Sequence, residues 1–244
     1  MNVIVTSGGT REPIDSVRSI ANHATGRLGA KIADGFARAG SGRIVYLCGP
    51  GAALPESGQV EVRPIRGTLE LEHELRRLTA EDRFDAIVHS MAVSDYRVRH
   101  VTTVAAMAQA AADQPPERLA EALAAAPGPD RSGKLRSDVD DLCLLLERTP
   151  KLIGLLRTLA PQAVLVGFKL LDHVPHEELI AVARQLLEKN DCDLVLANDM
   201  ETVASPCHCG FLLDRAGGER RCEGKDAIAA AIVAAVGERV GETV

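Results

Sequence analysis

Short apolar runs alternate with amphipathic helical segments along most of the 244-residue chain. The expected strands are 2–6, 43–48, 60–65, 85–90, 163–168 and 193–197. The expected helices are 26–39, 67–79, 149–159, 176–189 and 225–240. Strands that alternate with helices are joined by right-handed crossovers and form a parallel sheet. We therefore predict an α/β fold with a doubly wound, mostly parallel, Rossmann-like sheet and helices on both faces.

Two segments depart from this alternation. Residues 98–132 are rich in alanine, proline and charge, and 104–126 are expected to form one or two short alanine-rich helices. The Pro/Gly segment that follows is expected to be a flexible linker or mobile loop. Residues 211–214 and 219–222 flank Ala216-Gly217-Gly218, which predicts a small β-hairpin projection. Strands after the 98–132 insertion complete the sheet, so we expect a single domain over 1–244.

Composition excludes several classes of function. The net charge is −6, the basic residues form no run, and aromatic residues make up only 2% of the chain, which argues against nucleic-acid binding. No apolar stretch reaches the length of a membrane span. The first residues already form an expected strand, so we expect no signal peptide. Six cysteines in a chain of this length indicate a reducing, cytoplasmic location.

The first connection of the expected sheet carries an unusual set of polar residues. It leads from the glycine turn Gly8-Gly9 to a helix with Thr25 as the expected N-cap and Gly26 and Gly29 in its first turn. A strand that leads through glycines to a helix start is typical of an anion site. About sixteen residues intervene, far more than in a dinucleotide-binding turn. The connection therefore predicts a substrate site, although an ordinary surface loop is the alternative. Its polar residues are Arg11, Glu12, Asp15, Arg18 and Asn22.

Other polar residues follow the expected strands at their carboxyl ends, where ligands bind in this architecture. Asp95 is either a ligand of a metal, base or ribose, or a turn aspartate. Lys134 and Arg136 occupy alternate positions of an expected strand beside the mobile loop, so Lys134 either closes over a polyphosphate or is simply solvated. Phe168 either stacks on a nucleobase or belongs to the core.

Three further groups are less specific. Lys189 lies near a helix C-terminus, where a cation also stabilises the helix dipole. Asn198 and Asp199 form a polar strand end. The segment Cys207-His208-Cys209, with Cys222 nearby, contains soft zinc ligands but lacks the C-x-x-C spacing, so free thiols are favoured.

Motifs for other enzyme classes are missing. The chain has neither a G-x-S-x-G elbow nor a Walker A lysine. His100 stands where a reductase would have a lysine four residues after Tyr96. An NAD(P)-dependent reductase thus remains an alternative with weak support, and a catalytically silent nucleotide-binding module is another.

Eight segments, in the same order along the chain, closely resemble the phosphopantothenate–cysteine ligase family, also called phosphopantothenoylcysteine synthetase. The chain resembles the free-standing bacterial form, for which the preceding flavin-dependent decarboxylase domain is expected to be absent. The eight segments are 6–10, 14–18, 22–26, 92–96, 134–137, 149–151, 167–170 and 197–199.

This resemblance implies a reaction and its participants. The family joins 4′-phosphopantothenate to the amine of L-cysteine through an acyl-nucleotide, with CTP in bacterial members and ATP in the eukaryotic type. CTP is the expected nucleotide here, with magnesium, but the base preference stays open. The family also implies a cytoplasmic homodimer in which a strand-rich projection reaches the partner's site. Either the predicted hairpin or the 98–132 insertion would serve as that projection.

The resemblance also assigns roles by position. Asn22 would bind the acyl group near the reaction centre, Lys134 would be the catalytic loop lysine, and Arg18 and Ala92 would bind the acyl substrate. Gln185 replaces a second lysine that many members have before Lys189. The metal ligands are not assigned. The implied nucleotide-binding residues are Gly8, Gly9, Gly26, His89, Ser90, Met91, Asp95, Lys134, Pro150, Lys151, Leu152, Ile153, Phe168 and Lys189.

Overall fold

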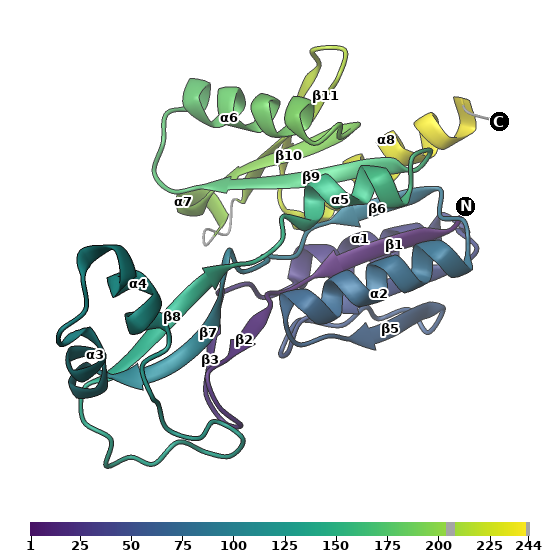
Figure 1. Cartoon of the computed structure of the whole chain (residues 1–244). Coiled ribbons are helices and arrows are strands. Elements are labelled where there is room, and N and C mark those ends of the chain that lie inside the picture. The colour runs from purple at the N-terminus through teal and green to yellow at the C-terminus, as the bar shows by residue number, and fades with distance from the viewer. Residues whose placement is uncertain (204–207, 243–244) are drawn as a thin grey trace.

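The computed structural model describes residues 1–203 and 208–242, and its centre is an eight-stranded sheet (Figure 1). The strand order is β12-β11-β10-β9-β6-β1-β4-β5. The six strands from β10 to β5 run parallel, which confirms the predicted α/β, mostly parallel sheet. They are β1 (Val3–Ser7), β4 (Ile44–Cys48), β5 (Val60–Pro64), β6 (Ala86–His89), β9 (Val164–Leu171) and β10 (Leu194–Asp199).

Helices cover both faces of this sheet, as predicted (Figure 1). One face packs against α1 (Arg27–Arg38) and α8 (Lys225–Glu242). The other face packs against α2 (Thr68–Glu81), α5 (Leu152–Leu159) and α6 (His176–Lys189). The short helix α7 (Met200–Val203) follows β10 directly. None of the helices in the described residues is both long and apolar enough to cross a membrane.

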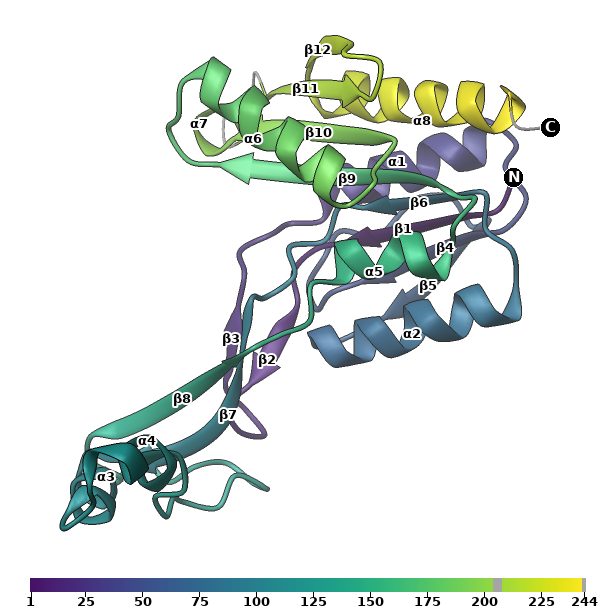
Figure 2. The ribbon, with the colours of Figure 1, turned by 45° about the horizontal axis from the view of Figure 1, so that its top comes forward.

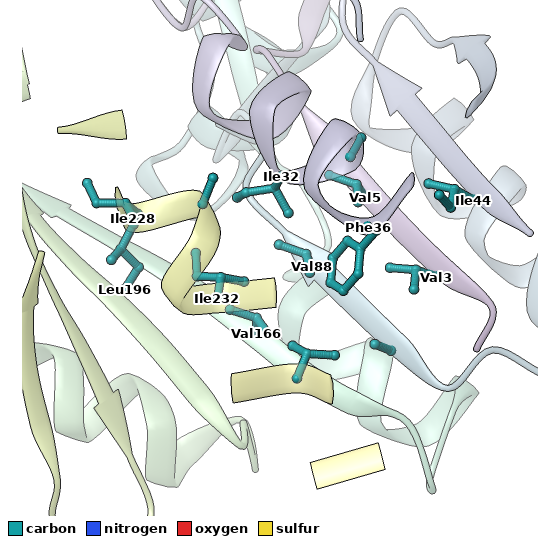
Figure 3. Close-up of a cluster of buried hydrophobic side chains, with 14 of the residues drawn as sticks. Val3, Val5, Ile32, Phe36, Ile44, Val88, Val166, Leu196, Ile228 and Ile232 are labelled. Carbon is teal, nitrogen blue, oxygen red and sulfur yellow. The ribbon is translucent and has the colours of Figure 1, made fainter. Parts of the chain in front are cut away.

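The hydrophobic core consists of two layers, because successive side chains of a strand point to opposite faces. Val3 and Val5 pack with Ile32 and Phe36 of α1, and Figure 3 shows this cluster extending to Ile232 of α8. Residues between them in the strands, such as Ile4, belong to the second cluster with α2, α5 and α6. Burial on both faces explains why the parallel strands are continuous apolar runs rather than alternating ones.

The hairpin predicted near the C-terminus forms, but it extends the sheet. Strands β11 (Cys209–Asp214) and β12 (Glu219–Glu223) pair antiparallel, and β11 also pairs antiparallel with β10. The hairpin is therefore an edge of the central sheet, because β10 offers its free backbone groups to β11. The projection of this molecule comes from a different part of the chain.

A two-stranded arm leaves the body of the molecule (Figure 2). Strands β7 (Tyr96–Thr103) and β8 (Leu142–Arg148) pair antiparallel, with an irregularity between Val98 and His100. Helices α3 (Val104–Ala111) and α4 (Pro116–Ala124) lie at the tip, so the alanine-rich segment forms two helices as predicted. A small ribbon of β2 (Arg11–Pro13) and β3 (Ser19–Ala21) lies beside the base of the arm.

Two leucines of α2 test how much of the stability comes from the buried helix face. Leu71 is fully buried, whereas Leu69 on the same helix is 48% exposed. We expect Leu71→Ala to lower the free energy of unfolding by about 2–5 kcal/mol, because it leaves a cavity. Leu69→Ala should change it by less than about 0.5 kcal/mol. Urea denaturation of both variants measures the difference, and equal losses would contradict this packing.

Candidate functional site

The carboxyl ends of β1 and β6 bring Asn22 and Ala92 together. Gly9 and Ala92 form a parallel bridge, and the Ala92 N–H donates to the Gly8 carbonyl at 2.8 Å. The Asn22 side chain donates to the Ala92 carbonyl at 3.4 Å. A Cβ on Gly9 would lie 2.6 Å from the Asn22 carbonyl, so only glycine permits this approach. Gly8, Gly9, Asn22 and Ala92 therefore lie side by side.

The start of α1 differs from the sequence prediction. Its N-cap is Gly26, with φ of 69°, and no side chain caps the helix. The prediction of Thr25 as N-cap is therefore wrong. A left-handed backbone at this position favours glycine, and the turn it makes places the Gly26 carbonyl 3.0 Å from the Ser7 hydroxyl. The first turn of α1 has no acidic side chain, so its positive end is left for an anion.

A pocket of about 300 Å³ lies between the β6–β7 connection, α5, β9 and α6. It brings together eight of the residues implied to bind nucleotide. These are His89, Met91, Asp95, Pro150, Lys151, Leu152, Ile153 and Phe168. Lys169 also lines the pocket, although we did not select it from the sequence. The sequence did contain a signal for Lys169. It is a lysine at the carboxyl end of a strand, inside the segment 167–170 that resembles the family.

Other predicted residues lie outside this pocket. The Ser90 hydroxyl donates to the Thr6 carbonyl at 2.7 Å, on the side of Gly26 and α1. Lys189 is exposed in the last turn of α6, one turn beyond Leu186, which does line the pocket. The structure does not bring Lys189 to the pocket wall.

The segment around Lys134 also differs from the prediction. Residues 134–136 form a loop rather than a strand, so Lys134 and Arg136 do not share a sheet face. Arg136 pairs with Asp138 in the same loop. The expected mobile loop is held against the first connection, because Arg131 donates to the Ile14 carbonyl at 2.9 Å. Lys134 itself is exposed.

His89 is a buried histidine at the end of β6 that lines the pocket. The Met91 N–H donates to the Thr6 hydroxyl at 3.3 Å, and the same hydroxyl lies 2.9 Å from His89 Nδ1. Burial lowers the pKa of His89 to about 4, so the side chain is neutral at physiological pH.

The mouth of the pocket is spanned by an ion pair between Asp95 and Lys151. Both side chains are more than half exposed, so this pair contributes at most about 1 kcal/mol to stability. Below it, the Thr149 N–H donates to the Asp95 carbonyl at 3.0 Å. These contacts hold the start of α5 against the β6–β7 connection. Either charged group can therefore leave its partner and bind a ligand instead, with little loss of stability.

No group of three histidine, cysteine or acidic side chains that could hold a metal occurs among residues 1–203 and 208–242. His208 Nε2 lies 3.0 Å from Asn198 Oδ1, and Cys209 and Cys222 carry free thiols. Cys207, part of the candidate zinc segment, lies outside the described residues.

The neutral state of His89 makes stability depend on pH. Its pKa in the folded protein lies below the unfolded value, so this contribution is complete above about pH 6.5 and is lost as the pH falls toward 4. We expect a loss of about 2 kcal/mol between pH 7 and pH 5 from this group alone. His89→Asn keeps an acceptor for the Thr6 hydroxyl and should reduce the pH-dependent loss by that amount.

Urea denaturation at the two pH values measures this effect. His208, whose pKa burial and Lys225 lower to about 4, adds a similar loss in both proteins and cancels in the comparison. His73→Asn, which removes an exposed histidine of α2, is the control and should keep the wild-type dependence. An unchanged pH dependence in His89→Asn would contradict a lowered pKa of His89 in the folded protein.

Known proteins resemble this chain over most of its length. The sequence matches the family described as "DNA/pantothenate metabolism flavoprotein C-terminal domain" over residues 1–106 and 98–239. The coenzyme A biosynthesis bifunctional protein CoaBC of Thermococcus kodakarensis is 32% identical over 206 residues, which cover 83% of this chain and 42% of that protein. The Escherichia coli CoaBC is 26% identical and is covered to 41%. The chain therefore spans about two fifths of these relatives.

Solved structures agree. The DNA/pantothenate metabolism flavoprotein of Streptococcus pneumoniae superposes with a TM-score of 0.83 at 32% identity, over 98% of this chain and 99% of that one. A Cab2 mutant in complex with phosphopantothenate-cysteine has the same fold, with a TM-score of 0.68 at 20% identity, over 98% of this chain and 86% of that one. With this match over nearly its whole length, the chain belongs to the DNA/pantothenate metabolism flavoprotein C-terminal domain family.

Proposed function

We propose that this chain is a ligase of coenzyme A biosynthesis that joins 4′-phosphopantothenate to L-cysteine. The product is 4′-phosphopantothenoylcysteine, released with a nucleotide monophosphate and pyrophosphate. The observation that carries this proposal is the single pocket lined by eight residues implied to bind nucleotide, next to Asn22 and Ala92. Two relatives support it: CoaBC is named for coenzyme A biosynthesis, and the Cab2 structure contains phosphopantothenate-cysteine.

The first half-reaction activates the acyl group. CTP, or ATP, places its base and ribose between Phe168 and the start of α5, and the carboxylate of 4′-phosphopantothenate attacks the α-phosphorus. The bond to the β-phosphate breaks and pyrophosphate leaves. Two anions meet in this step, so the Lys134 ammonium and the positive end of α1 offset the developing charge. A bound Mg²⁺ would neutralise part of the phosphate charge, and it usually keeps several water ligands beside the phosphates.

The second half-reaction forms the amide. The amine of L-cysteine attacks the acyl carbon and the nucleotide monophosphate leaves with the bonding electrons. Asn22 lies 3.4 Å from the Ala92 carbonyl, so its amide is positioned to bind the acyl group at the junction of β1 and β6. The mixed anhydride hydrolyses readily, and the loop that carries Lys134 excludes water from it.

We propose that the active form is a cytoplasmic homodimer built through the arm. A two-stranded ribbon has little stability by itself. The first five residues of strand β8 are nevertheless apolar, and its Leu146 is 46% exposed. An exposed apolar ribbon of this kind is typical of an interface. Pairing of the two arms buries it and brings the arm of one protomer to the site of its partner.

Pyrophosphate release tests the ligase directly. Purified protein with 4′-phosphopantothenate, cysteine and Mg²⁺ should release pyrophosphate faster with CTP than with ATP, and only when the acyl substrate is present. Lys134→Ala should lower this rate by about a hundredfold or more, because it removes a charge that stabilises the transition state. Lys31→Ala, which removes a partly exposed lysine of α1 that pairs with Asp226 of α8, is the control.

Other outcomes of this assay would support the two alternative functions. Nucleotide binding without turnover would indicate the silent module, and a spectral shift of added NAD(P)H would indicate the reductase. Asn22→Asp places a negative charge beside the anionic acyl group and should also slow the reaction. Full activity in Lys134→Ala or Asn22→Asp would remove that residue from the mechanism.

The dimer makes a separate prediction. Sedimentation velocity should give the mass of two chains, and Leu146→Glu should give a monomer, because a carboxylate at this exposed position of β8 cannot be buried without a partner. Leu69→Glu places the same charge on an exposed leucine of α2 in the body and should leave the dimer intact. A monomeric wild-type protein, or a dimer that tolerates Leu146→Glu, would contradict an interface on this arm.

A further inference from the structure

Asp15 is a buried carboxylate that joins two distant loops. Its side chain is fully buried. One oxygen accepts the N–H groups of Val17 and Arg18 at 2.8 and 2.6 Å. The other accepts the N–H of Leu135 at 3.0 Å, across 120 residues of sequence. A carboxylate with three backbone donors is firmly held, so Asp15 ties the backbone of Leu135 to the first connection.

Arg18 holds the same residue through its carbonyl group. Its guanidinium lies 3.5 Å from the Asp15 carboxylate and donates to the Leu135 carbonyl at 3.4 Å. The N–H and the C=O of Leu135 are therefore bound by two residues of one turn. The Leu135 side chain is only 1% exposed and packs with Val98 and Val101 of the arm. This residue is fixed by polar and apolar contacts together.

Further contacts run along the same path. Arg131 donates to the Ile14 and Pro13 carbonyls at 2.9 and 3.2 Å. The Ser16 N–H donates to the Gly133 carbonyl at 3.5 Å. The 131–135 loop thus follows the first connection, which continues through β3 to Asn22. A loop attached at these points has little freedom to move as a lid.

The charge of Asp15 agrees with this role. Burial by itself raises the pKa of its carboxyl group, but the backbone N–H groups of Arg18, Val17 and Leu135, together with the Arg18 charge, outweigh burial and lower the pKa. The carboxylate is ionised at neutral pH and can accept all three hydrogen bonds. Neutralising it would leave one N–H donor without an acceptor.

We propose that Asp15 and Arg18 are positioning residues that fix the backbone next to Lys134, the residue before Leu135, and so set this lysine for the phosphate chemistry. This inference rests on the proposed ligase function. Arg18 is thereby given a role through the loop backbone, in addition to the substrate contact implied by its sequence position. Neither residue needs to touch the nucleotide, because a shift of about 1 Å in a catalytic group lowers the rate strongly.

Asp15→Asn tests the tether, by which we mean the hydrogen bonds that tie the backbone of Leu135 to Asp15 and Arg18. The asparagine side chain has one oxygen where the aspartate has two, and its NH₂ group cannot accept a hydrogen bond. The Leu135 N–H therefore loses its acceptor. We expect faster hydrogen exchange of the Leu135 amide, and a kcat for pyrophosphate release at least about tenfold lower with the KM for CTP within about twofold. Asp138→Asn is the matched control, since that exposed carboxylate of the same loop binds only Arg136. It should keep the wild-type rate and exchange.

Arg18→Met is the second variant and preserves the aliphatic stem of the side chain. A positioning role lowers kcat with little change in the KM for 4′-phosphopantothenate, whereas a pure substrate contact raises that KM. Wild-type kcat in Asp15→Asn, in protein whose circular dichroism is unchanged, would overturn the inference. If Asp15→Asn does not fold, a raised KM with unchanged kcat in Arg18→Met would overturn it.

Failure of the ligase function gives a different result. Wild-type protein would then release no pyrophosphate with either nucleotide, whatever the state of the tether. Hydrogen exchange of the Leu135 amide in Asp15→Asn would then test the tether without reference to activity. Faster exchange supports the tether, and wild-type exchange overturns it.

Discussion

Burial of the central parallel strands on both faces is the constraint on which the rest of this structure depends. Strands β1, β6 and β9 have no side that faces water, so their side chains are nearly all aliphatic until the carboxyl ends. Polar chemistry is then possible only where these strands end and their connections begin. The pocket and the Asn22–Ala92 contact occur at this edge because it is the one place where loops from β1, β6 and β9 meet.

The same constraint makes the edge unusually close-packed. Backbone segments approach one another until a Cβ would not fit, as at Gly9 against the Asn22 carbonyl. Polar groups there are satisfied by neighbouring loops, and the buried hydroxyl of Thr6 links the Met91 backbone to His89. A site built in this way is organised before any ligand arrives, and its hydrogen-bond donors need little rearrangement.

The strands of the arm are subject to a different constraint. Strands β7 and β8 cannot bury both faces of a two-stranded ribbon within one chain. Val98 and Val101 form a small cluster with Leu135 and Leu144, and Leu146, which pairs with Val98 on the same face, stays exposed. Leu135 brings its loop to this cluster. The arm therefore connects the loop that carries Lys134 with the surface proposed to meet a second protomer.

Apolar periodicity was enough to predict the strands and helices of the sheet, because it records which residues are buried. The sequence also predicted which segments lie at the carboxyl edge of the sheet, and the eight pocket residues came from that analysis and from the family resemblance. The pairing of β7 with β8, the extension of the sheet by β11 and the contact of Asp15 with Leu135 could be seen only in the folded chain. Periodicity shows that a side chain or a strand edge needs a partner. The identity of that partner, 120 residues away for Asp15, depends on how the whole chain packs.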